Sequence, residues 1–167
     1  MKIETNLDLS FSRDIDISPK QVWAAWTTPK LLMPWFCPAP WKTVACDIDL
    51  RVGGKFYTVM QSPEGQKYPN LGCYLTIIPN QKLVWTNALL PDFRPAKQAA
   101  PNPDHPCEEL MMTATILLEP TKNGTKYTAQ VMHAHEEARI AHEKMGFEAG
   151  WGMCLDQLVA FVKSHNI

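Results

Sequence analysis

The sequence lacks the features that define several common classes of protein. Its 167 residues carry 16 basic and 17 acidic side chains, so neither sign of charge is in excess. Electrostatic binding of nucleic acid needs cations arrayed against phosphates, and the balance of charge excludes it. No uncharged apolar run approaches the roughly 18 residues of a membrane span. Residues 1–6 lack the apolar stretch of a signal peptide, so we expect a cytoplasmic protein.

Cysteine is sparse and irregularly placed. The five cysteines are odd in number, and no two of them have the short spacing of a zinc knuckle: Cys37, Cys46, Cys73, Cys107 and Cys154. We interpret them as free and mostly buried thiols. The sequence also has no Gly-x-Ser-x-Gly elbow, phosphate loop or dinucleotide fingerprint. We therefore expect neither a structural metal nor a cofactor.

What is present is the composition of a folded domain. Hydrophobic residues make up 46% of the chain and charged residues 20%, which excludes a disordered protein. A chain of this length buries roughly 70% of its surface on folding, and we expect a single domain over residues 1–167. The stretch 89–110 holds five prolines and fits neither a regular helix nor an inner strand. It is either a lid or binding loop, or a tolerated surface insertion.

Hydrophobic periodicity predicts the order of the elements. Alternation over residues 7–11 indicates a half-buried strand, and Ser18-Pro19 is typical of a helix start. A second short helical turn is expected at residues 31–32. From residue 43 the period becomes two, and Gly53-Gly54 favours a primed hairpin turn into the next strand. Short connections between the later alternating runs predict an antiparallel meander, with strands at 72–78, 82–88, 111–118 and 125–133.

The last element is a predicted helix. Six apolar residues recur there at helical spacing and indicate one buried face: Phe147, Trp151, Cys154, Leu155, Leu158 and Val162. Glycines at 146, 150 and 152 serve either close packing of this helix on the sheet or space for a ligand. Together the elements predict an α+β fold in which the last helix covers one face of the sheet.

Several blocks of sequence between Arg13 and Lys163 carry a family resemblance. They are PKQVWAAWTTP (19–29), WFCP (35–38), DLRVGGKF (49–56), GCYLTIIPNQKLVWT (72–86), NGT (123–125) and GFEAGW (146–151). In this order and spacing they resemble the family of activator-of-heat-shock-protein-ATPase homologues, part of the START-related SRPBCC superfamily.

The resemblance implies the helix-grip fold. In this START-like fold a curved antiparallel sheet wraps around a long C-terminal helix, two short helices follow the first strand, and a cavity lies between sheet and helix. Members are taken to bind hydrophobic small molecules, and a few relatives in the superfamily catalyse cyclisation or hydration. The cochaperone that names the family has an additional N-terminal domain, for which this chain has no room. We therefore expect no heat-shock chaperone as a partner.

Aromatic residues are the candidates to line such a cavity. Six tryptophans, six phenylalanines and four tyrosines can line an apolar cleft and stack on flat ligands, although most aromatic residues belong to a plain core. The segment 34–41 is rich in proline and irregular, so its aromatic residues are the better candidates. The predicted ligand-binding residues are Trp35, Phe36, Trp41, Phe56, Met60, Tyr74, Trp85, His133, Phe147 and Trp151.

His133 is included because it shares the parity of the apolar face of its strand, and we expect it to point inward. An inward histidine is usually held by a core hydrogen bond. Alternatively, it anchors a ligand or acts as a general acid or base. His135, Glu136 and His142 lie near it in the sequence, but they do not form a His-Glu-x-x-His motif, and we expect no metal site.

The sequence therefore predicts a non-catalytic domain that binds a small hydrophobic or aromatic molecule. One alternative is an enzyme of the cyclase or lyase kind, with His133 as acid/base and Tyr74 or the loop of Asp92 assisting. The other is a chaperone-partner module, which needs a large exposed apolar patch. The sequence leaves a homodimer open.

Overall fold

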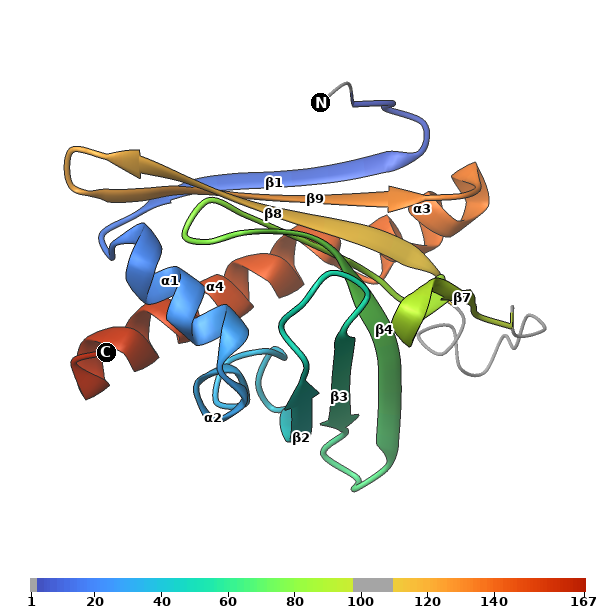
Figure 1. The fold of residues 1–167 in the computed structure, drawn as a ribbon, viewed down its shortest axis with the longest axis horizontal. Coiled ribbons are helices and arrows are strands. Elements are labelled where there is room, and N and C mark those ends of the chain that lie inside the picture. Colours follow the sequence, from blue (N-terminus) through green and yellow to red (C-terminus); the bar gives the residue numbers. More distant parts are fainter. Residues whose placement is uncertain (1–2, 98–109) are drawn as a thin grey trace.

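A seven-stranded antiparallel sheet curves around one long helix in the computed structural model, which describes residues 3–97 and 110–167 (Figure 1). The strand order is β1-β9-β8-β5-β4-β3-β2. Most strands therefore pair with the strand that precedes or follows them in the sequence, and β1 pairs with β9 at one edge of the sheet. The strands are β1 (Asp8–Ile15), β2 (Lys42–Ile48), β3 (Lys55–Gln61), β4 (Lys67–Ile78), β5 (Lys82–Thr86), β8 (Met112–Thr121) and β9 (Gly124–His133). The predicted antiparallel meander is confirmed.

Two short helices follow β1, as predicted. Helix α1 (Pro19–Thr27) begins with a capping box: the Ser18 hydroxyl accepts from the Gln21 amide at 3.3 Å, and Gln21 Oε1 accepts from the Ser18 amide at 2.8 Å. Helix α2 (Pro29–Leu32) follows at once, because a proline cannot continue the preceding helix. These features fix where α1 begins and where it ends.

The C-terminal helix α4 (Phe147–His165) lies along the inner face of the sheet, under β1, β9 and β8 (Figure 1). Phe147, Leu155, Leu158 and Val162 are buried, which confirms the predicted apolar face. A helix that we did not predict, α3 (Glu136–Lys144), joins β9 to α4. Its sequence is mostly charged, so no apolar period marks it.

Alternation along the strands sends one set of side chains toward α4. On β9, four alternate residues are buried: Tyr127, Ala129, Val131 and His133. His133 therefore points inward, as predicted. Ala114 and Trp85 continue the same row on β8 and β5, because they pair in register with Val131 and with each other. The core lies between this face and α1, α2 and α4.

The connection between β2 and β3 differs from the predicted primed turn. It is a longer loop, residues 49–54, in which Gly53 alone has a positive φ, of 76°. The Gly53 amide donates to the Tyr74 carbonyl at 2.7 Å, and the Gly53 carbonyl accepts from the Asp92 amide at 2.8 Å. The loop is thus held by β4 and by the 91–93 turn, which a sequence pattern cannot reveal. Leu50, in this loop, is exposed.

The proline-rich stretch is described only in part. Residues 89–97 contain a small hairpin of β6 (Leu89–Leu90) and β7 (Arg94–Pro95) around a 3-10 turn, η1 (Pro91–Phe93). Asp92 and Phe93 both have left-handed backbone angles there. The rest of the predicted lid or insertion, including Cys107, lies outside the described residues. Within the described ranges, none of the helices combines the length and apolar character that crossing a bilayer requires.

Candidate functional site

Aromatic rings form a continuous network between the sheet and the helices. Phe56 of β3 is at its centre, with ring-centroid distances of 5.7 Å to Phe36, 5.4 Å to Tyr74 and 4.9 Å to Trp85. Phe36 lies 5.8 Å from Trp35 in turn. These five predicted residues therefore lie together, although they come from four separate segments of the chain.

A tryptophan that we did not predict as a site residue joins this group to α4. Trp26 of α1 contacts Trp35 at 5.0 Å and Phe36 at 5.6 Å, and it stacks on Trp151 of α4 at 6.4 Å. Trp151 then contacts Phe147 at 5.8 Å. The signal for Trp26 was its position in an apolar helix, which does not distinguish a site residue from ordinary core.

At the other end of the network, two histidines pair with each other. His133 Nε2 and His142 Nδ1 are 3.0 Å apart, and His133 Nδ1 is 2.9 Å from the carbonyl of Leu7. Because a carbonyl only accepts, Nδ1 of His133 carries the proton, and Nε2 accepts from His142. Both ring nitrogens of His133 are thus engaged within the core. The His142 ring also contacts Phe147, with centroids 5.2 Å apart.

Burial keeps this pair neutral. Desolvation lowers the pKa of His142 to about 4, with a further lowering from His133 beside it. Desolvation also lowers the pKa of His133, against a smaller opposing effect of its hydrogen bond to Leu7. Among the described residues there is no group of three or more histidine, cysteine, aspartate or glutamate side chains that could hold a metal ion.

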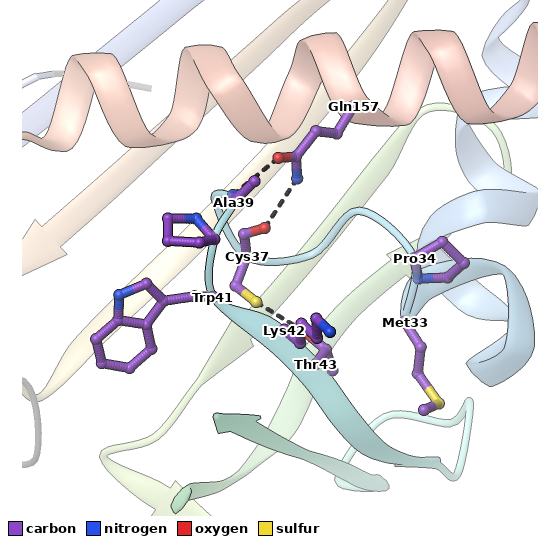
Figure 2. A pocket seen from close by; sticks show the side chains of 9 residues that line it. Met33, Pro34, Cys37, Ala39, Trp41, Lys42, Thr43 and Gln157 are labelled. Atoms are coloured by element: carbon purple, nitrogen blue, oxygen red, sulfur yellow. Dashed lines mark hydrogen bonds between the residues drawn. The ribbon is translucent and has the colours of Figure 1, made fainter. Parts of the chain in front are cut away.

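Two predicted residues lie outside the ring network. Met60 is half-buried on β3 and pairs in register with Tyr68. Trp41 contacts Tyr68 at a centroid distance of 5.3 Å and lines a surface pocket of about 620 Å³ beside α2, β2 and α4 (Figure 2). Prolines 34 and 40, Met33 and Lys42 also line this pocket. A second surface pocket, of about 570 Å³, lies around Ser18 and Asn80.

The wall of the pocket in Figure 2 is braced by a side chain of α4. Gln157 donates to the carbonyl of Cys37 at 2.8 Å and accepts from the amide of Ala39 at 2.9 Å. The Cys37 thiol accepts from the Thr43 hydroxyl at 3.4 Å. Burial raises the pKa of this thiol, so it stays protonated and is not an activated nucleophile.

Seven buried side-chain polar atoms of the described residues have no hydrogen-bond partner, and two of them belong to rings that contact Phe56. Tyr74 Oη, Trp85 Nε1, Trp35 Nε1 and Thr58 Oγ1 are buried and have no hydrogen-bond partner among the described residues. Native interiors contain few such atoms, and each calls for a physical explanation.

The three glycines at the start of α4 differ in their position and in the space around them. Gly146 precedes the helix with a φ of 91° and is exposed, so it is not an interior position of the helix. A Cβ on Gly150 would meet no atom within 4 Å, whereas one on Gly152 would contact Phe11 at 3.9 Å. Open space, not close packing, therefore surrounds Gly150.

The charged candidates lie at the surface. Asp92 forms an ion pair with Arg51 at 3.0 Å, and its side chain is 75% exposed. Asp47 pairs with Lys55 and Asp49 with Arg51, and these ion pairs also lie at the surface. Cys37, Cys46, Cys73 and Cys154 are free thiols.

A curved antiparallel sheet gripping a terminal helix, with two short helices after the first strand and a ring-lined interior, defines a helix-grip domain of the START-like class. Residues 16–163 match the sequence model of the family described as "Activator of Hsp90 ATPase homolog 1-like protein". The match spans most of the chain, and the protein therefore belongs to this family.

Solved structures agree with the assignment. The chain is similar to a protein from Nitrosomonas europaea, with 44% identity, a TM-score of 0.89 and coverage of 98% of this chain and 99% of that one. A protein from Arthrobacter aurescens has 26% identity and a TM-score of 0.76, with coverage of 95% and 87%. One from Rhodobacter sphaeroides, at 23% identity, a TM-score of 0.78 and coverage of 98% and 97%, shares the fold. No curated protein matches the chain.

Proposed function

We propose that the protein binds a small apolar or aromatic molecule between the inner face of its sheet and α4, without catalysing a reaction. The observation that carries the proposal is the set of buried donors around Phe56 that have no partner among the described residues. A plain core is expected to be free of such groups, because each one costs about 1–3 kcal/mol.

The surrounding rings support the same site. Phe36, Phe56, Tyr74 and Trp85 come from separate segments and present flat apolar surfaces to one another at centroid distances of 4.9 to 5.7 Å. Pockets for small molecules are typically apolar and aromatic, with few polar groups that fix orientation. Open space also lies beside Gly150 of α4.

An enzymatic function has less support. A general acid or base must reach the substrate with a free nitrogen, and both nitrogens of His133 are taken up by Leu7 and His142. Asp92, the proposed assistant, is paired with Arg51 at the surface.

A chaperone-partner function would use exposed apolar side chains. The side chains of Leu50, Val52 and Phe93 are each more than 40% exposed. The Phe93 ring lies close to Gly53, the residue that follows Val52, so these side chains belong to one region of the surface. Failure of the protein to coprecipitate a heat-shock chaperone would leave this patch without that role. We also place the protein in the cytoplasm, since its free thiols suit a reducing compartment.

Variants of two tryptophans can show whether a ligand binds at the interior site or in the surface pocket of Figure 2. Native mass spectrometry should first find any molecule retained by freshly purified protein, and a thermal-shift panel of lipids and polycyclic aromatics should find further ligands. We expect Trp151→Leu, in the ring network, to weaken binding, and Trp41→Leu, in the surface pocket, to leave it unchanged.

Three results would contradict the proposal: no ligand in either experiment, loss of binding only in Trp41→Leu, or turnover of the bound molecule. Loss in Trp41→Leu alone would move the site to the surface pocket of Figure 2.

A further inference from the structure

The buried donors share one face of three neighbouring strands. Tyr74 and Trp85 pair in register on β4 and β5, and Thr58 lies two residues from Phe56 on β3, which puts both on the same face. Tyr74 and Trp85 both contact the Phe56 ring. The rings that carry the phenol and the indole N–H therefore both contact Phe56, and the threonine hydroxyl belongs to the same face of the sheet.

These groups are buried almost completely. Tyr74 is 0% exposed, Thr58 1% and Trp85 2%. An indole N–H can only donate, and a phenol or hydroxyl without a partner can donate as well. Desolvation raises the pKa of Tyr74, with a smaller contribution from Cys46, so the phenol keeps its proton.

Among the described residues, none of the fully buried side chains is an aspartate, glutamate, lysine or arginine. The buried polar residues among those described are threonines, a serine, a glutamine and two histidines, and the histidines are paired with each other as neutral groups. An ionised ligand would lose its hydration without gaining an opposite charge, which is strongly unfavourable. The site therefore favours a neutral molecule.

We infer that the ligand is a neutral, flat apolar molecule with at least one carbonyl-type oxygen, which accepts hydrogen bonds from Tyr74 Oη and Trp85 Nε1. This inference rests on the proposed function and narrows its ligand class. A hydrocarbon of the same shape would fill the apolar space but leave the donors unpaired. A site built to hydrogen-bond discriminates against such an analogue, because its own polar groups then stay unsatisfied.

A matched pair of compounds tests the inference. Fluorene and 9-fluorenone share one ring skeleton and differ in a single carbonyl group. Calorimetric titration of the full chain should show 9-fluorenone binding at least about tenfold more tightly, the effect of one net hydrogen bond. The carbonyl stretch of bound 9-fluorenone should move to lower frequency in the infrared spectrum.

Two variants remove the donors: Tyr74→Phe deletes the hydroxyl alone, whereas Trp85→Phe also reduces the size of the ring. Tyr74→Phe and Trp85→Phe should each reduce the preference for 9-fluorenone several-fold, and Tyr74→Phe should reverse part of the infrared shift. Tyr57→Phe, on the other face of β3, is the control and should change neither. Because the Tyr74 hydroxyl has no partner, ligand-free Tyr74→Phe should melt at the same temperature as the wild type or about 2–4 °C higher.

The outcomes separate the two claims. Equal affinity for the two compounds, or a preference that survives both variants, overturns the inference and leaves the proposed function standing. Binding of neither compound overturns the inference, whereas the proposed function falls only if native mass spectrometry and the thermal-shift panel also find no ligand. A lower melting temperature for ligand-free Tyr74→Phe, together with equal affinities, would identify buried water as the partner of the phenol and overturn the inference.

Discussion

The pair of His133 and His142 should make the stability of the fold depend on pH. Burial lowers the pKa of His142 to about 4, whereas a histidine in the unfolded chain titrates near its ordinary value of about 6.5. The unfolded chain therefore takes up a proton first as the pH falls. The stabilising contribution of neutral His142 is complete above about pH 6.5 and is lost progressively as the pH falls toward 4.

The size of the effect follows from the two pKa values. At about pH 5 the unfolded histidine is almost fully protonated and the folded one is not, which costs about 2 kcal/mol of unfolding free energy. His133 acts in the same direction, because its pKa is also lowered. The structural cause is that the hydrogen bond between the two rings needs one neutral acceptor nitrogen, at 3.0 Å from its donor.

The test is urea unfolding of the wild type and His142→Gln at about pH 7.5 and about pH 5.0. The difference between the two proteins isolates the contribution of His142 to the free energy of unfolding, because the other ionisable groups are common to both. The variant should be less stable at the higher pH, and the difference should move in its favour by about 2 kcal/mol at the lower pH. His165→Gln, at the exposed end of α4, is the control for a histidine-to-glutamine change outside the buried pair. A wild-type-to-variant difference that is the same at both pH values would refute the reasoning.

Three further predictions concern the scaffold, and urea unfolding checks each. Ser18→Ala removes the capping box and should cost about 1 kcal/mol, so an unchanged midpoint would contradict the assigned cap. Gly150→Ala should raise the free energy of unfolding by up to about 1 kcal/mol, because the new Cβ meets no atom within 4 Å. Gly53→Ala should lower it by about 1–2 kcal/mol, because Gly53 has a φ of 76° and the Phe93 ring would lie 3.0 Å from the new Cβ. Equal effects of the two glycine variants would contradict this contrast. Phe56→Ala should cost about 3–5 kcal/mol, and a cost below about 1 kcal/mol would remove it from the centre of the ring network.

Local patterns predicted those parts of the fold that depend on local chemistry. Ser18 and Pro19 mark the start of α1 because capping is a contact between residues three apart. The alternation on β9 placed His133 inside because the two faces of a strand alternate with every residue. Helix α3 was missed because it covers little apolar surface, and its charged sequence has no apolar stripe.

Sequence patterns predicted which aromatic residues lie near one another better than they predicted the arrangement of those residues. Parity and irregular segments identified Phe56, Tyr74, Trp85 and Phe36, which do lie together. The same reasoning placed Trp41 with them, yet it lies at the surface against Tyr68. The side on which a residue of the 33–41 segment lies depends on contacts such as Gln157 to Cys37, 120 positions apart in the chain, and no local pattern encodes these.

The buried polar atoms of His133 and His142 have hydrogen-bond partners, whereas those of Tyr74 and Trp85 have none among the described residues, and this difference suggests a division of roles. At the end near α3, His133 and His142 satisfy each other and the Leu7 carbonyl, so that end is closed by internal hydrogen bonds. At the end formed by β3, β4 and β5, equally buried donors have no partner among the described residues. Both ring nitrogens of His133 are already paired, whereas the Tyr74 phenol and the Trp85 indole N–H still have a hydrogen bond to donate to an external acceptor. Ligand recognition should therefore depend on Tyr74 and Trp85, and stability on the histidine pair.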